Sequence, residues 1–359
     1  MAKGQIPTKV VKVDPQSPEQ IFLIEAAEIL KEGGLVIVPT ETVYGIAANT
    51  QNRKAMERLC EIKKRPKNKP FAMIIDDKSK VELYARNIPI AAYKLIDKFW
   101  PGPLTLILES KEEEKIGLRL PDNKVTQNII ARSGVPLACP SANLSGKPAP
   151  NNFEEAIRDL EGLVELGIDA GEAKVGIESS IVDLTVEPLQ VLRVGAIKKE
   201  EIQKAALKKT VLFVCTGNSC RSVMAEALLK KMLKERKRDD VEVLSAGLMI
   251  LGGMGATADT IEVLKKEGID VSGHHSQRVS EAMLKKCDLI LVMERIHEQR
   301  ILTLAPAVKN RVFLLKEFAK IGDTDSGFDI EDPIGHDNEF YEKTFLVIKE
   351  AVERVSNLI

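Results

Sequence analysis

A cysteine and an arginine six residues apart, Cys215 and Arg221, stand in the stretch VLFVCTGNSCRSVMAEALL, residues 211–229. Four apolar residues predict a buried strand before the cysteine, and an amphipathic pattern from Val223 predicts a helix after a polar loop that ends at Ser222. In such a strand-loop-helix unit the loop amides and the helix N-terminus point at one spot and bind anions. This field stabilises a thiolate, and a guanidinium there binds two phosphate oxygens. The pattern predicts nucleophilic attack on phosphorus.

Other residues of this half suit the same chemistry. Gly217 and Asn218 tolerate the left-handed backbone that a tight loop needs, and Ser222 can hydrogen-bond the thiolate. Attack on phosphorus also needs an acid for the leaving group. Asp332, in FDIEDPIGHD, supplies a carboxyl group, and Pro333 favours an extended or turn conformation for it.

Three motifs, VCTGNSCRS, SAG (245–247) and the Asp-Pro pair at 332, together resemble the low-molecular-weight protein phosphatase family. The resemblance implies Cys215 as the nucleophile that forms a phosphocysteine, Arg221 as the phosphate clamp and Asp332 as the general acid, with phosphorylated proteins as substrates and no cofactor. It implies further loop residues that support the phosphate: Thr216, Gly217, Asn218, Ser219, Cys220 and Ser222. Val223 stands where the family has proline, which removes no reacting group.

Several features of this half allow alternatives. Cys220 either protects Cys215 through a reversible disulfide or is a packed loop residue. Arsenate reductases share the cradle but use closely spaced resolving cysteines, whereas only Cys287 follows here, so we rank that activity low. The small Ser219 and the non-aromatic Ile334 favour phosphoarginine slightly over phosphotyrosine as the substrate. The chain's histidines lack metal-ligand spacing and are expected to be solvated: His274, His275, His297 and His336.

The first half has a dense basic stretch, RKAMERLCEIKKRPKNKP, at residues 53–70. Lys63, Arg65 and Lys69 crowd around Pro66, where a helix cannot continue comfortably, so we expect a basic loop suited to a polyphosphate. Polar clusters also follow apolar runs at five places: PTETVYG (39–45), RLP (119–121), PSANLSG (140–146), GIESS (176–180) and RVG (193–195).

In this order the clusters resemble the threonylcarbamoyl-AMP synthase family, in a short form without its additional C-terminal domain. The resemblance implies a twisted α/β sheet around a positive cavity, and a reaction of L-threonine, bicarbonate and ATP with Mg²⁺ that yields threonylcarbamoyl-adenylate and pyrophosphate. The activated group then passes to tRNA with the help of a transferase. By position, the resemblance assigns ATP binding to Lys63, Arg65, Ser141, Asn143 and Arg193, and threonine binding to Thr40, Arg119 and Ser179.

Two other interpretations of the first half stay open. It could be an RNA-binding module that no longer catalyses, although its PSANLSG and KKR elements favour the enzyme. Carbamoyl transfer for hydrogenase maturation would need acylphosphatase and zinc-finger segments that the chain lacks. Ser180 replaces a usual threonine, and KPFAMII lacks a histidine that many relatives carry, so the threonine pocket is only partly defined.

The elements that position these residues fall into two α/β domains, which we place at 1–209 and 210–359. The first has strand-like runs such as LVIVPT and LTLIL and a helix from Ser17 to Gly33 opened by a capping box. The second alternates strand and helix regularly, which predicts a parallel sheet in a three-layer fold.

The composition sets broad limits. A net charge of −1 argues against a global polyanion-binding surface, so binding sites must be local. There is no signal-peptide pattern or membrane span, and the five scattered cysteines suit reduced thiols, so we expect a cytoplasmic protein.

Overall fold

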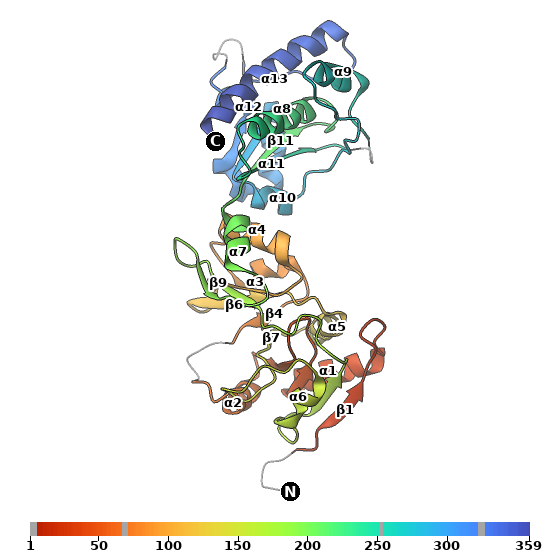
Figure 1. Cartoon of the computed structure of the whole chain (residues 1–359), viewed down its shortest axis with the longest axis vertical. Coiled ribbons are helices and arrows are strands. Elements are labelled where there is room, and N and C mark those ends of the chain that lie inside the picture. The colour runs from red at the N-terminus through yellow and green to blue at the C-terminus, as the bar shows by residue number, and fades with distance from the viewer. Residues whose placement is uncertain (1–5, 67–70, 251–253, 322–326) are drawn as a thin grey trace. The chain divides into compact units, whose positions relative to one another are not determined.

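The chain divides into two compact units, Met1–Ala206 and Leu207–Ile359 (Figure 1). This division lies three residues before the predicted end of the first domain at 209. The computed structural model describes residues 6–66, 71–250, 254–321 and 327–359. In this part of the chain no helix is long and apolar enough to cross a bilayer.

The first unit is built on a mixed ten-stranded sheet in the order β1-β8-β2-β3-β7-β4-β6-β5-β9-β10, which confirms the predicted α/β class. Some neighbours are parallel, such as β1 and β8, and others antiparallel, such as β2 and β3. The strands are β1 (Lys9–Lys12), β2 (Val36–Val38), β3 (Gly45–Asn49), β4 (Met73–Ile74), β5 (Leu104–Glu109), β6 (Lys115–Arg119), β7 (Leu137–Ala138), β8 (Leu166–Asp169), β9 (Ser180–Asp183) and β10 (Gln190–Arg193).

Helices cover both faces of this sheet. Helices α1 and α5 bury apolar residues with β2 and β8 in one cluster, and α2 and α6 do so with β2 and β3 in another. A third cluster packs α4 and α7 against β5 and β6. The helices are α1 (Gln20–Glu32), α2 (Arg53–Ile62), α3 (Val81–Tyr84), α4 (Ile90–Phe99), α5 (Lys124–Ser133), α6 (Phe153–Arg158) and α7 (Lys199–Leu207), with a 3-10 turn η1 (Lys78–Lys80).

The predicted start of α1 is wrong, whereas its predicted end is confirmed. The helix begins at Gln20, and Glu19 at its N-cap makes no side-chain capping hydrogen bond, so the capping box expected from Ser17 does not form. Gly33 ends the helix with a φ of 91°, a left-handed conformation that glycine adopts at little cost.

The second unit has a four-stranded sheet in the order β12-β11-β13-β14, and every pair is parallel, as predicted. Its strands are β11 (Lys209–Cys215), β12 (Val241–Gly247), β13 (Leu289–Val292) and β14 (Val312–Leu314). Its helices are α8 (Arg221–Glu235), α9 (Ala258–Lys266), α10 (Glu281–Lys286), α11 (Arg295–Leu304), α12 (Leu315–Phe318) and α13 (Asn338–Leu358), with a 3-10 turn η2 (Pro306–Arg311).

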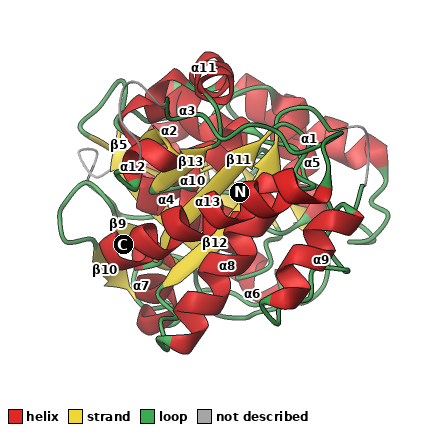
Figure 2. Cartoon of the chain, turned by 90° about the horizontal axis from the view of Figure 1, so that it is seen from above, coloured by secondary structure: helices red, strands yellow, loops and turns green. Residues whose placement is uncertain are grey.

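The side chains of β11 point alternately to the two faces of the sheet, and helices cover both faces, which gives this unit three layers. Val211 and Phe213 belong to a core shared with α8, α9 and α13, whereas Leu212 and Val214 belong to a core shared with α10 and α11. Helices α8 and α13 pack on each other over the first of these faces (Figure 2). Helix α8 begins at Arg221, two residues earlier than predicted, so the clamp arginine belongs to the helix rather than to the loop.

Candidate active sites

In the second unit, β11 delivers Cys215 directly into the loop that opens α8. The thiol is buried, and its Sγ accepts a hydrogen bond from the Asn218 amide at 3.3 Å. The Ser222 hydroxyl lies 3.0 Å from the same sulfur and also accepts from Asn218 Nδ2 at 3.0 Å, so its own hydrogen is available to the sulfur. Both donors are therefore placed to hydrogen-bond the sulfur of the nucleophile.

Asn218 holds the shape of this loop. Its φ of 53° is left-handed, and its side chain donates to Ser245 Oγ at 2.8 Å while its Oδ1 accepts from the Gln277 amide at 2.9 Å. Gly247 of the SAG motif lies so close that an added Cβ would sit 2.8 Å from Thr216 O and 2.9 Å from Asn218 N. The glycine of this motif therefore allows β12 to pack closely against the loop that follows Cys215.

Arg221 is the buried cation of the site, with 1% of its surface exposed. Its Nη1 donates to Glu294 Oε2 and to Ile330 O, both at 2.6 Å, and its Nη2 pairs with Asp332 Oδ2. Within the described residues its Nε is buried and has no acceptor. Because an unsatisfied buried donor is costly, this nitrogen indicates that an anion binds in the loop. The structure thus brings the predicted nucleophile, clamp and acid together.

The expectation of solvated histidines is wrong for His297. The ring is 2% exposed because it folds back over the N-terminus of α11, where Nδ1 accepts from the Glu294 amide at 3.2 Å. Its Nε2 lies 2.9 Å from Thr216 Oγ1, beside the nucleophile. Burial, followed by the charge of the clamp arginine, lowers the pKa of His297 to about 4, so the ring is neutral. His274 is half-buried, and its Nε2 lies 2.8 Å from Asn218 O.

The other cysteines of this unit are also free and buried. Cys220 Sγ lies 3.4 Å from Tyr341 OH and 3.4 Å from Thr257 Oγ1. Cys287 Sγ donates to Met283 O at 3.1 Å, and burial raises the pKa of its thiol to about 12, which makes it a poor nucleophile.

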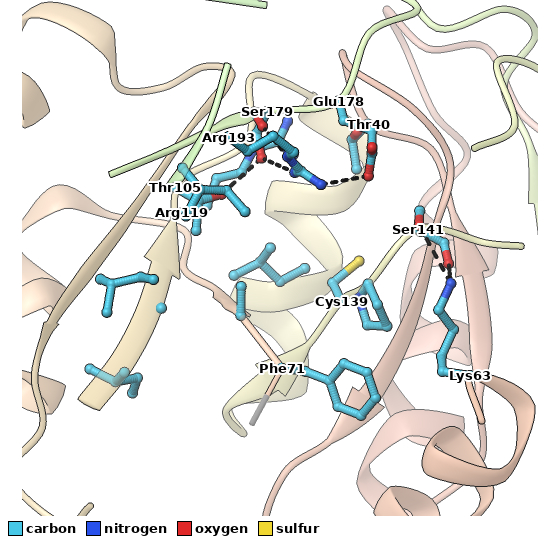
Figure 3. Close-up of a pocket in the computed structure, with 18 of the residues that line it drawn as sticks. Thr40, Lys63, Phe71, Thr105, Arg119, Cys139, Ser141, Glu178, Ser179 and Arg193 are labelled. Atoms are coloured by element: carbon cyan, nitrogen blue, oxygen red, sulfur yellow. Dashed lines mark hydrogen bonds and ion pairs between the residues drawn. The ribbon is translucent and has the colours of Figure 1, made fainter. Parts of the chain in front are cut away.

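In the first unit a cavity of about 720 Å³ gathers the predicted substrate residues (Figure 3). Seven of the eight line it: Thr40, Lys63, Arg65, Arg119, Ser141, Ser179 and Arg193. The eighth, Asn143, contacts Lys63 beside the cavity. Lys69 and Pro70 of the predicted basic loop lie outside the described residues.

Lys63 forms one cationic corner of the cavity. Its Nζ donates to Ser141 O at 2.9 Å, to Asn143 O at 2.7 Å and to Asn143 Oδ1 at 2.8 Å. Burial lowers the pKa of Lys63 to about 8. Arg65 adds a second cation, with its guanidinium 4.8 Å from the centre of the Phe71 ring.

Arg193 forms a second cationic corner. It donates to Glu178 Oε1 at 2.7 Å and to Ser179 O at 2.9 Å, and the Ser179 hydroxyl lies 2.9 Å from Thr105 Oγ1 (Figure 3). Gly195 explains the RVG motif, because an added Cβ would meet Glu178 O at 2.1 Å. The segment after Arg193 can therefore approach the GIESS motif only if position 195 has no side chain.

Arg119 is held by the PTETVYG loop. Its Nη2 donates to Glu41 Oε1 at 2.7 Å and to Thr42 Oγ1 at 2.8 Å, and its Nε donates to Gly102 O at 3.2 Å. Among the described residues, no donor reaches the buried Glu41 Oε2. Glu41 therefore mainly binds and orients Arg119, a role that the sequence did not reveal.

Both halves match known families. Residues 28–195 match the Sua5, YciO and YrdC family, described as Telomere recombination, and residues 210–358 match the family described as Low molecular weight phosphotyrosine protein phosphatase.

Individual relatives agree with the first match. The chain is 40% identical over 188 residues to the threonylcarbamoyl-AMP synthase of Pyrococcus abyssi, which covers 50% of this chain and 55% of that protein. It therefore spans about half the length of that curated relative. A relative from Methanocaldococcus jannaschii is 36% identical over 205 residues, 55% of this chain and 95% of its own length. The crystal structure of P. abyssi Sua5 complexed with L-threonine superimposes with a TM-score of 0.53 at 28% identity, covering 67% of this chain and 92% of that one.

Proposed function

The chain belongs to the Sua5, YciO and YrdC family through its first unit and to the low-molecular-weight phosphatase family through its second, and we propose that it is a bifunctional cytoplasmic enzyme. The first unit joins L-threonine, bicarbonate and ATP into threonylcarbamoyl-adenylate and pyrophosphate, an activated group for tRNA. The second hydrolyses phosphorylated proteins through a cysteine.

The cavity around Lys63 carries the proposal for the first unit. Lys63, Arg65 and Arg193 line one space and can neutralise a triphosphate, while Arg119 adds a cation for the carboxylate of threonine. Joining these substrates needs positioning and charge neutralisation rather than a covalent nucleophile. The structural neighbour from P. abyssi is described as a complex with L-threonine, which supports the choice of amino acid.

The cavity also fits Mg²⁺ carried by ATP. This ion is usually held by one or two carboxylates, substrate phosphates and water. The described residues contain no cluster of three or more His, Cys, Asp or Glu side chains for a resident metal. Glu178 lines the cavity beside Arg193, and would contribute one carboxylate to an ion bound mainly by the phosphates. The ion would neutralise charge on the leaving pyrophosphate.

The second unit supports a double displacement. Cys215 attacks phosphorus, the S–P bond forms as the bond to the leaving group breaks, and Asp332 gives its proton to that group. Water then attacks the phosphorus of the phosphocysteine while Asp332 takes a proton from that water, and the S–P bond breaks to release inorganic phosphate and the Cys215 thiolate. The bound phosphoryl group would satisfy Arg221 Nε and compete with Asp332 for Nη2, which frees the acid to face the leaving group.

We favour phosphoarginine over phosphotyrosine for this unit. Ser219 is buried in the cradle and leaves polar room beside the phosphoryl group, while Ile334 is 54% exposed and offers no flat ring at the rim. Ser219→Ile should depress phosphoarginine hydrolysis far more than phosphotyrosine hydrolysis. A wild-type preference for phosphotyrosine peptides, or equal losses on both substrates, contradicts this assignment.

Pyrophosphate release tests the synthase proposal. With ATP present, release should require both threonine and bicarbonate, and Arg65→Ala should abolish it because a phosphate-neutralising cation is lost. A first unit that binds RNA without releasing pyrophosphate would be a binding module instead.

A further inference from the structure

Thr216 follows the nucleophile directly, and its hydroxyl oxygen contacts two side-chain nitrogens. His297 Nε2 is 2.9 Å from Thr216 Oγ1, and Arg221 Nη2 is 3.4 Å from the same oxygen. A guanidinium has only donors, so Arg221 can only donate to this oxygen. The remaining question is which way the hydrogen points between Thr216 and His297.

The surroundings of His297 answer this question. Its Nδ1 accepts a hydrogen bond from the Glu294 amide and therefore carries no proton. A neutral imidazole then has its hydrogen on Nε2, and Glu294 Oε2, 3.5 Å from Nε2, favours the same tautomer. His297 must therefore donate to Thr216 Oγ1.

Both lone pairs of the Thr216 oxygen are then occupied, and its hydroxyl hydrogen needs another acceptor. The two contacts with His297 and Arg221 are the hydrogen bonds of this hydroxyl among the described residues. The loop that contains Thr216 is the anion cradle, where Arg221 Nε also lacks an acceptor. One tetrahedral oxyanion in the cradle would satisfy both groups.

We propose that Thr216 donates its hydroxyl hydrogen to an oxygen of the bound phosphoryl group, and that His297 is the positioning residue that fixes this direction. The inference rests on the proposed phosphatase function and adds a binding contact to it. Without the histidine, the hydroxyl would rotate and donate elsewhere for part of the time.

Oxyanion affinity measures this contact. Inorganic phosphate and orthovanadate are titrated calorimetrically into the full chain and its variants, and are also tested as inhibitors of p-nitrophenyl phosphate hydrolysis. Thr216→Val and His297→Phe should each weaken both anions about tenfold or more, since a hydrogen bond to a charged group is lost or misdirected. Thr216→Ser, which keeps a hydroxyl, should retain the wild-type affinity. Thr303→Val removes an exposed hydroxyl from the same helix as His297 and should change nothing.

A double variant tests whether His297 acts through Thr216. If it does, the Thr216→Val/His297→Phe double variant binds the anions no more weakly than Thr216→Val alone. If the two residues act independently, their losses of anion affinity add in the double variant. His297→Asn replaces His297→Phe in this test if circular dichroism shows that the phenylalanine variant does not fold. Unchanged anion affinity in Thr216→Val, or additive losses, overturns the inference. A wild-type chain that binds phosphate but hydrolyses no phosphoester would contradict the proposed function instead, and the binding results would still decide the role of Thr216.

Discussion

The pH dependence of ATP binding should follow the protonation of Lys63. Burial lowers the pKa of this lysine from 10.5 to about 8, and its charged form faces the cavity that we assign to ATP. Protonation is then roughly 90% at pH 7 and roughly 10% at pH 9. ATP is fully ionised above pH 8 and cannot cause a further change. The affinity for ATP should therefore fall about tenfold per pH unit above pH 8.

This loss of ATP affinity can be distinguished from unfolding, because affinity and stability change in opposite directions with pH. Between pH 8 and 10.5 the unfolded chain holds a proton on Lys63 that the folded chain has released. Stability therefore rises with pH through this window, as far as Lys63 is concerned, while the affinity for ATP falls. Denaturant unfolding at each pH would show that a weaker affinity is not caused by a less stable protein.

ATP binding should be measured by calorimetry without threonine, because the amine of threonine also titrates in this range and would mix a second effect into turnover. Lys63→Arg is the matched control, since a guanidinium stays charged throughout. We expect the ATP affinity of this variant not to change with pH in this range. Its affinity should be lower than that of the wild type, because a planar guanidinium cannot repeat the three hydrogen bonds that Lys63 Nζ donates to Ser141 and Asn143. A flat profile for the wild type, or an equal fall in both proteins, would refute the role of Lys63.

Three further predictions follow from the contacts of the two sites. Gly247→Ala should abolish phosphatase activity and cost about 1–3 kcal/mol of stability, because its Cβ would press on loop backbone, whereas Gly273→Ala, with open space around it, should be neutral in both assays. Asp332→Asn should slow hydrolysis of substrates with poor leaving groups and spare p-nitrophenyl phosphate; equal rate losses would remove it from the acid role. Glu41→Gln should raise the KM for threonine about tenfold with little change for ATP, since Arg119 loses its charged partner; equal KM increases would point to a general collapse of the cavity.

Much of the second site could be predicted because its chemistry lies in short, contiguous motifs. The loop from Cys215 to Ser222 and the alternating strands and helices together specify one edge of a parallel sheet. His297 was missed because its contact spans 81 residues, and its signal in the sequence is only a histidine in the first turn of a helix. The pairing of Glu294 with Arg221 was missed for the same reason, because these residues are 73 positions apart in the sequence.

The first sheet was harder to predict. Its short strands β7 and β8 follow no regular βαβ order, and their neighbours in the sheet are remote in sequence. Glu41 and Glu178 stood inside the quoted motifs, but their partners Arg119 and Arg193 could be identified only in space, since a motif shows which residue types occur and not how they pair. The start of α1 differs because Glu19, rather than the better capping residue Ser17, occupies the N-cap.

Two separate activities in one chain are tested most directly by a pair of variants, each assayed for both reactions in the full-length protein. Arg65→Ala should abolish pyrophosphate release that depends on threonine and bicarbonate while leaving p-nitrophenyl phosphate hydrolysis unchanged. Cys215→Ser should abolish the hydrolysis, because a serine hydroxyl is scarcely ionised where a thiolate forms, while leaving pyrophosphate release unchanged. Loss of both activities from either variant, or persistence of the targeted one, would contradict the assignment of one reaction to each unit.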